Sequence, residues 1–292
     1  MEYAISIDLG GTKIATCLVN ETGKIIYGTR VLTCAKLGRK KVLDNLTGSI
    51  RKVMDKYKDL NIKGIGIGIP GFVDNKGNIV FMPNVPLVGV NIADYLSRIF
   101  HCPVYVENDA NCFAFGEYHF GKHKSNLLLG IIVGTGIGCG FVYNGRVLSG
   151  ARGGAGEIGH ILLDNAAKKL LVSKNDFESY CSGPNIERRY EASGGKHKIC
   201  KKIFMSNSPL AKKTVNDEYE YLGKLLGIVV NTLNPDTVIF GGGVSHALDT
   251  KRMENEIRKY CIPFTANTMK VKDSRLDDLA SVLGAAALVF KN

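Results

Sequence analysis

The sequence lacks the features that mark a membrane protein, a zinc ribbon or a dithiol redox enzyme. Its longest apolar run, which begins at Leu127, is interrupted by glycines and is too short to span a bilayer. The eight cysteines form no CxxC pair, and no two of them lie closer than ten residues. No signal peptide precedes the first apolar segment. We therefore expect reduced thiols, a cytoplasmic location and no membrane partner.

Aromatic side chains are few where the positive charge is concentrated. The 292-residue chain carries a net charge of +11, and many of its basic residues lie between Lys168 and Lys213. Proteins that bind single-stranded nucleic acids interleave such charges with aromatic rings on which bases stack. This segment has no such interleaving, so we interpret it as a solvated basic face and expect no nucleic-acid partner.

One structural plan occurs twice in the chain. Residues 3–33 predict three strands with a glycine turn between the first two, and residues 126–150 predict the same arrangement. In each half a segment with helical spacing of apolar residues follows, and then a buried strand that ends in glycines: "KGIGIGIPG" in the first half and "DTVIFGGGV" in the second. We predict two α/β lobes across a central cleft, 1–121 and 122–276, with a C-terminal helix over 277–292 completing the first.

Two glycine motifs resemble nucleotide fingerprints but stand in the wrong context. "GIGIPG", at Gly66–Gly71, satisfies GxGxxG, yet a hairpin and not a helix is predicted to follow it. "GEYHFGKH", at Gly116–His123, resembles a P-loop but follows a helical pattern and ends in histidine where Ser or Thr would hold magnesium. Neither is expected to bind a nucleotide.

Six further motifs occur in the order found in the ROK family, which unites sugar kinases and sugar-responsive repressors within the actin-like ATPase superfamily. They are "IDLGGTK", "ENDANCFAFGE", "GTGIGCG", "GEIGH", "NPDTVIFGGGV" and "LGAAAL". The chain resembles that family from Ile5 to Leu288. The resemblance implies an α/β, two-lobed actin-like ATPase (ribonuclease H-like) fold with a duplicated βββαβ plan. The repressors add a DNA-binding module before the first glycine turn; this chain reaches Asp8 at once, which favours the kinases.

The resemblance also implies where ATP and magnesium bind. A glycine turn presents several N–H donors to one anion, so the turn after the first strand suits the terminal phosphates of ATP. Asp8 would hold Mg²⁺, which needs only one or two carboxylates besides phosphate oxygens. A plain tight turn is the alternative interpretation. The implied ATP-binding residues are Gly10, Gly11, Thr12, Lys13, Gly134, Thr135, Gly136, Gly241, Gly242 and Gly243.

Asp109 is the expected catalytic residue. It follows a predicted strand and precedes a predicted helix, and its carboxylate can accept the proton of an attacking sugar hydroxyl. The alternative is that Asn108 and Asp109 only cap the helix. The family resemblance assigns sugar binding to Asn84, Asn108, Asp109, Glu157, His160 and Glu178.

The chain departs from many family members in one region. They carry a cysteine-rich zinc module between the "GH" pair and the later glutamate, whereas this chain has no cysteine between His160 and Glu178. We expect no structural zinc, and apolar packing in its place. The leucines and valine expected to supply that packing are Leu162, Leu163, Leu170, Leu171 and Val172.

The predicted function is an ATP-dependent sugar kinase that acts on a free hexose, glucose first. N-acetylglucosamine, N-acetylmannosamine, fructose and allose are alternative substrates. A sugar-sensing regulatory protein without turnover is the alternative from another class, and an assembly or chaperone ATPase is a third. The family likeness further implies a homodimer.

Overall fold

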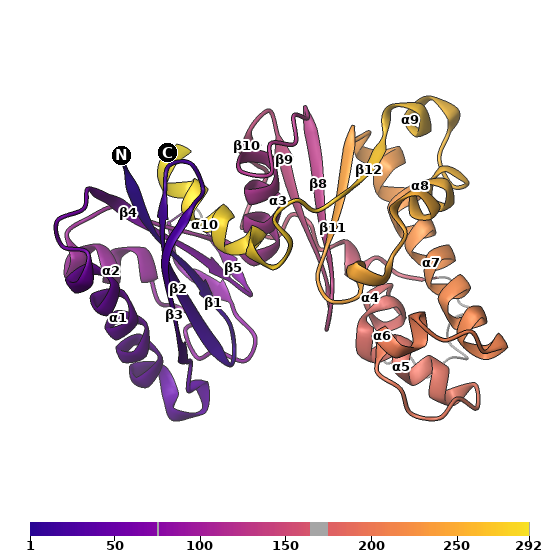
Figure 1. The fold of residues 1–292 in the computed structure, drawn as a ribbon, viewed down its shortest axis with the longest axis horizontal. Helices are drawn as coiled ribbons and strands as arrows, with labels where there is room; N and C mark the ends of the chain where they lie inside the picture. Colours follow the sequence, from indigo (N-terminus) through magenta and orange to yellow (C-terminus); the bar gives the residue numbers. More distant parts are fainter. Residues whose placement is uncertain (75, 164–174, 292) are drawn as a thin grey trace. The chain divides into compact units, whose positions relative to one another are not determined.

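The computed structural model describes residues 1–74, 76–163 and 175–291, in which strands and helices alternate (Figure 1). The strands are β1 (Tyr3–Leu9), β2 (Lys13–Asn20), β3 (Ile25–Leu32), β4 (Ile62–Ile69), β5 (Phe72–Val73), β6 (Ile79–Phe81), β7 (Val104–Asn108), β8 (Leu127–Val133), β9 (Ile137–Tyr143), β10 (Arg146–Val147), β11 (Thr237–Gly241) and β12 (Lys270–Asp273). The helices are α1 (Gly38–Lys56), α2 (Ile92–Phe100), α3 (Asp109–His119), α4 (Glu178–Cys181), α5 (Gly183–Ala192), α6 (Cys200–Phe204), α7 (Pro209–Leu233), α8 (Thr250–Arg258), α9 (Pro263–Thr268) and α10 (Ala280–Lys291).

Residue contacts divide the chain into two compact units. The first comprises residues 1–124, 140–155 and 278–292, and the second comprises residues 125–139 and 156–277. The C-terminal helix α10 belongs to the first unit, as its small residues led us to expect. Residues 140–155 also group with the first unit, although the sequence placed them after residue 121. The lobe boundaries given above stay a prediction.

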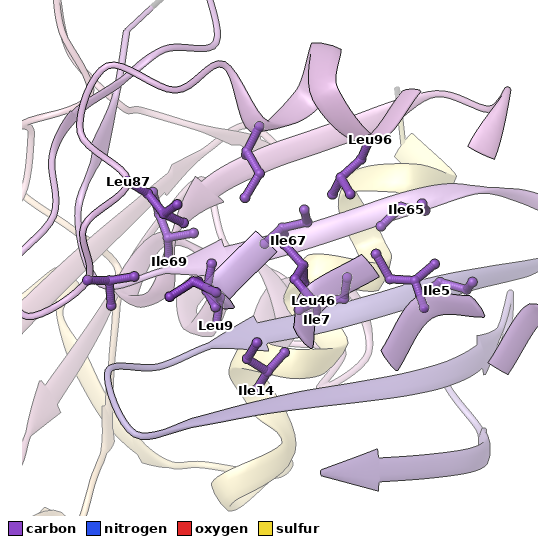
Figure 2. Close-up of a cluster of buried hydrophobic side chains, with 14 of the residues drawn as sticks. Ile5, Ile7, Leu9, Ile14, Leu46, Ile65, Ile67, Ile69, Leu87 and Leu96 are labelled. Carbon is purple, nitrogen blue, oxygen red and sulfur yellow. The ribbon is translucent and has the colours of Figure 1, made fainter. Parts of the chain in front are cut away.

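The first unit is built on a five-stranded sheet with the order β3-β2-β1-β4-β7. The strands β1, β4 and β7 are parallel, and β2 and β3 continue the sheet as antiparallel hairpins. On one face, alternate residues of β1 and β4 form an apolar core with α1 and α2, including Ile7, Ile67, Leu46 and Leu96, all fully buried (Figure 2). The alternation of residues along each strand sends only one set of side chains to this face.

The opposite face of the same sheet packs closely against helices because β4 carries glycine there. In "KGIGIGI" every isoleucine from Ile65 onward points into the core, and every glycine faces α3 and α10. A methyl group on Gly66 would lie 1.8 Å from the carbonyl oxygen of Ala285, and one on Gly284 would lie 1.7 Å from that of Cys112. Bare backbone on both sides of these contacts lets α10 approach both β4 and α3.

The second sheet has the order β10-β9-β8-β11-β12. The strand β11 lies parallel to both β8 and β12, and Gly241 is opposite Ile132. In the second unit the long helix α7 contacts α5, α6 and α8. A buried ion pair between Arg189 of α5 and Glu218 of α7, 2.5 Å apart, joins two of these helices, and the Arg189 guanidinium lies over the Tyr180 ring.

Most of the predicted elements are confirmed. Both three-stranded meanders form, and the segments after them become α1 and β4 in the first half and α7 and β11 in the second. The hairpin β5–β6 follows Gly71, so the first misleading glycine motif is not a dinucleotide turn. The second misleading motif begins inside α3.

One expectation about the segment after His160 is wrong. Leu163 is buried as predicted, but the side chain of Leu162 is 72% exposed and cannot contribute apolar packing. Leu162 instead forms an isolated bridge with Asp176 through the backbone. The remaining residues of that prediction, Leu170, Leu171 and Val172, lie outside the described residues.

Candidate active site

The turn between β1 and β2 has the free backbone donors that a phosphate group needs. The N–H of Gly10 donates to the carbonyl oxygen of Lys13 at 3.0 Å and closes the turn. The hydroxyl of Thr33 donates to the carbonyl oxygen of Gly10 at 2.6 Å, which ties the turn to the end of β3. Within the described part of the chain the N–H groups of Gly11 and Thr12 have no hydrogen-bond partner. Neighbouring N–H donors without a protein partner in one tight turn are a feature that can bind an anion, and phosphate binding here stays a prediction.

The sheet register brings this turn to the same edge as the candidate catalytic residue. Asp8 is opposite Gly68 of β4, and Gly68 is opposite Glu107 of β7. Since neighbouring strands lie about 4.8 Å apart, Asp8 and Glu107 lie about 10 Å apart across the sheet. Asn108 and Asp109 follow at the carboxyl end of β7. The carboxyl ends of parallel strands are where open α/β sheets bind their ligands.

Asn108 caps α3, and Asp109 is its first residue. The Asn108 side-chain oxygen accepts hydrogen bonds from the N–H groups of Ala110 and Asn111, at 2.9 and 3.2 Å, and its amide donates to the carbonyl oxygen of Gly71. Asn108 therefore caps the helix, and its predicted role in sugar binding stays a prediction. The Asp109 Oδ1 atom accepts from the Ala110 N–H at 2.8 Å, a bond that fixes the carboxylate at the helix start.

Glu107 fixes this corner and was not selected from the sequence. Its Oε1 atom accepts hydrogen bonds from the Asn108 N–H at 2.8 Å and the Asn111 amide at 2.9 Å, and its Oε2 atom accepts from the Ser149 hydroxyl at 2.8 Å. A carboxylate with so many donors holds the strand end and the first turn of α3 in one position. The only sequence signal was its place directly before Asn108 and Asp109.

Asn84 lies beside the phosphate turn. Its backbone adopts a left-handed conformation with φ of 63°, which asparagine tolerates better than most residues. A methyl group on Gly11 would lie 3.5 Å from the Asn84 Cβ atom. Gly11, Thr12 and Asn84 together line a groove of about 980 Å³. The structure thus brings the predicted sugar-binding Asn84 next to the predicted phosphate-binding turn.

The glycines predicted for ATP binding in the second unit form two turns at the ends of β8 and β11. The N–H of Gly134 donates to the carbonyl oxygen of Gly136 at 2.9 Å, with Thr135 between them. Gly242 has φ of 88°, and a methyl group there would lie 2.6 Å from the carbonyl oxygen of Val133. Gly241 and Gly242 line a cavity of about 180 Å³ with Ser245 and His246.

The three polar residues predicted to bind sugar in the second unit form one cluster. The His160 Nε2 atom lies 3.6 Å from the Glu157 Oε2 atom. The Glu178 Oε2 atom accepts a hydrogen bond from the Ile137 N–H at 2.8 Å, and a methyl group on Gly136 would come within 2.6 Å of that oxygen. Burial raises the pKa of Glu157; His160 opposes this shift and the nearby Glu178 adds to it.

Asp176 orients the histidine and was also missed in the sequence. Its Oδ2 atom lies 3.0 Å from the His160 Nδ1 atom, while its Oδ1 atom accepts from the Ser179 N–H at 2.8 Å. Burial acts to raise the pKa of Asp176, but the bonds from Ser179 and His160 outweigh it and hold the pKa below its usual value. With Nδ1 bound to Asp176, the Nε2 atom of His160 is directed toward Glu157.

The hydrogen bond that His160 donates to Asp176 raises the pKa of His160, which gives a testable pH dependence. A histidine whose pKa is higher in the folded state than in the unfolded state contributes to stability. This contribution is fully present at a pH below the unfolded-state pKa and is lost as the pH rises through the folded-state pKa. Asp176→Asn is expected to lower the His160 pKa toward the ordinary histidine value, measured by NMR titration of the imidazole. The imidazole signals of His101, at the end of α2, serve as the internal reference in the same spectra. An unchanged His160 titration would show that the contact does not form in solution.

The residues at the edge of the first sheet fit a magnesium ion that arrives with a nucleotide. Asp8 is a single, half-buried carboxylate beside the phosphate turn, and Mg²⁺ bound to phosphates needs few protein ligands. Burial raises the pKa of Asp8, and the nearby charge of Arg30 opposes this shift. Across residues 1–74, 76–163 and 175–291, no three His, Cys, Asp or Glu side chains are grouped to hold a metal. The absence of structural zinc stays a prediction.

The family model described as the ROK family matches residues 4–292. The chain belongs to the ROK family. The N-acetyl-D-glucosamine kinase of Histophilus somni is 33% identical, covering 96% of this chain and 97% of the relative. The glucokinase of Halalkalibacterium halodurans is 30% identical, covering 98% and 94%. The xylose repressor of Bacillus spizizenii is 26% identical, covering 99% of this chain and 77% of the repressor.

Solved structures of this family confirm the fold class. A ROK family glucokinase from Streptomyces griseus, in complex with glucose and AMPPNP, has a TM-score of 0.80 and 26% identity, covering 99% of this chain and all of that chain. The ROK hexokinase from Thermus thermophilus has a TM-score of 0.83 and 28% identity, covering 99% and 98%. The α/β fold of the actin-like ATPases is therefore the fold of this chain. In the described residues, no helix is both long and apolar enough to cross a membrane.

Proposed function

We propose that this ROK protein is an ATP-dependent sugar kinase that transfers the γ-phosphate of ATP to a hydroxyl of a free hexose. The observation that carries the proposal is the sheet register, which brings a turn with two free N–H donors and the Asp109 carboxylate to one edge of the first sheet. Phosphoryl transfer requires mainly that the protein position the reacting groups and stabilise charge. The turn could bind the phosphates, and the Asp109 carboxylate could accept the proton of the attacking hydroxyl. The kinases among its relatives support the same activity.

In the proposed reaction the chain's own residues position the phosphates and remove one proton. The N–H groups of Gly11 and Thr12 and the Lys13 ammonium bind the terminal phosphates. Asp8 would hold the magnesium ion, which when bound would supply positive charge against the phosphate oxygens. The sugar hydroxyl oxygen forms a bond to the γ-phosphorus as the bond from that phosphorus to the β,γ-bridging oxygen breaks. Asp109 accepts the hydroxyl proton, and ADP leaves.

The remaining predicted residues are proposed to bind the two substrates. Asn84, Asn108, Glu157, His160 and Glu178 offer amide, carboxylate and imidazole groups suited to sugar hydroxyls. The turns at Gly134–Gly136 and Gly241–Gly243 offer close backbone approach to the nucleotide. Glucose is our first choice of sugar. N-acetylglucosamine is the second, because the Histophilus somni relative is an N-acetyl-D-glucosamine kinase by name. A cytoplasmic homodimer remains part of the proposal.

The test is sugar-dependent release of ADP from ATP with magnesium. The panel is glucose, N-acetylglucosamine, N-acetylmannosamine, fructose and allose, with a no-sugar control for background hydrolysis. We expect at least one sugar to stimulate ADP release well above that background. If none does, while calorimetry shows that a sugar binds, the regulatory interpretation replaces the kinase; the xylose repressor relative makes that the second candidate.

A further inference from the structure

A cavity on the first unit lies beside Asp8 and contains an arginine for which the sequence suggested no role. Its volume is about 470 Å³, and its lining residues include Asp8, Ala15, Gly28 and Arg30. Ala15 carries only a methyl group and Gly28 has no side chain, so they leave open space around the longer side chains of the lining. Leu279, directly before α10, and Val282, in its first turn, also line the cavity.

The register of β1, β2 and β3 places Arg30 in the same cross-strand row as Asp8. Asp8 is opposite Ala15, and Ala15 is opposite Arg30. Residues in register on neighbouring strands project to the same face of the sheet. Ile14 and Thr16, on either side of Ala15, are buried on the other face. Only a methyl group therefore separates the Asp8 and Arg30 side chains along the row.

Lys13 stands on the same face, at the turn end of β2. It is opposite Leu32, two residues from Arg30, so the two cations are diagonal neighbours about 7–8 Å apart at their Cα atoms. Both side chains are exposed. Among residues 1–74, 76–163 and 175–291, no hydrogen bond or ion pair holds the Arg30 guanidinium. A guanidinium that folding leaves unpaired presents its five donors to a ligand.

We propose that Arg30 is a nucleotide-binding residue that contacts the di- or triphosphate group of ATP or ADP from the β3 side of the phosphate turn. The inference rests on the proposed kinase function and adds a residue to it. The guanidinium fork matches phosphate oxygens geometrically and can form two parallel hydrogen bonds. In the proposed complex Asp8 holds the magnesium ion and Arg30 contacts the phosphate oxygens. A carboxylate and a guanidinium in one cross-strand row therefore suit a ligand that carries both a metal ion and phosphate groups.

The test compares three variants by isothermal titration calorimetry with Mg·ADP, a readout that needs no turnover. Arg30→Ala is expected to weaken Mg·ADP binding about tenfold to a hundredfold, the range for losing hydrogen bonds to a charged group. Arg30→Lys should lose less, because a point charge remains. Arg51→Ala is the matched control: it removes the same charge from an exposed arginine on α1, on the opposite face of the sheet. It should bind Mg·ADP like the wild type.

Adenosine binding separates a phosphate contact from a general loss of structure. The Arg30→Ala protein should bind adenosine as the wild type does, and its melting temperature should stay within a few degrees. Equal Mg·ADP affinity of the Arg30→Ala and Arg51→Ala proteins would overturn the inference and leave the kinase proposal standing. Equal loss of adenosine and Mg·ADP affinity would also overturn it. A wild-type protein that binds no nucleotide would overturn both proposals.

Discussion

Replacing Asp109 by asparagine is expected to lower kcat by about 10²- to 10⁴-fold while the fold and the binding of both substrates persist. The carboxylate is the proposed acceptor of the sugar hydroxyl proton, and a neutral amide cannot take that proton. The asparagine side-chain oxygen can still accept the hydrogen bond from the Ala110 N–H, which measures 2.8 Å in the native chain. The rate is measured with the sugar that the substrate panel selects, and the affinities by calorimetry.

Asp94→Asn is the matched control for this prediction. Asp94 also lies in the first turn of a helix of the first unit, α2, and the same neutral substitution there should leave kcat unchanged. Turnover of the Asp109→Asn protein near the wild-type rate would reduce Asp109 to a helix-capping role. A large loss of sugar affinity instead of kcat would mean that the residue binds the sugar and does not act as the base.

The elements that position the site could be predicted because local patterns specify them. Alternating apolar residues and a glycine turn predict β1, β2 and β3, and the acid–amide pair after a short apolar run marks the β7–α3 junction. The family motifs then nominate the residues at those turns. The register that aligns Asp8, Gly68 and Glu107 is a tertiary property, because it depends on which strands pair, and no local pattern in the sequence states it.

The residues that the sequence did not reveal act through contacts between distant segments. Glu107 is hydrogen-bonded to Ser149, 42 positions away, and Asp176 is hydrogen-bonded to His160, 16 positions away. Arg30 lies in the same cross-strand row as Asp8 only because β3 pairs with β2 in this register. A surface carboxylate or arginine has the same appearance in a sequence, so only the fold separates these from solvated charges. Leu162 shows the converse, since an apolar residue expected inside is exposed.

The alternation of glycine and isoleucine in β4 gives the largest expected effect on stability. A methyl group on Gly66 would lie 1.8 Å from the Ala285 carbonyl oxygen and 2.6 Å from its carbonyl carbon. These are backbone atoms of a buried helix, so no side-chain rotation can relieve the overlap, and α10 must move away from β4. Such overpacking costs about 3 kcal/mol, the upper end of the usual range.

Gly66→Ala is therefore expected to lower the melting temperature by about 6–12 °C, the shift that such a loss produces in a domain of this size. The same substitution at Gly48 is the control, because Gly48 is exposed on α1 and a methyl group there would meet nothing within 4 Å. Gly48→Ala should raise stability by about 0.5–1 kcal/mol, since alanine loses less backbone entropy in a helix than glycine. The same glycine-to-alanine substitution is thus expected to lower stability at Gly66 and to raise it at Gly48. Thermal and urea unfolding of the two proteins measure these changes and so test the packing of α10. If both proteins melt alike, α10 does not lie against β4 as closely as this backbone contact requires.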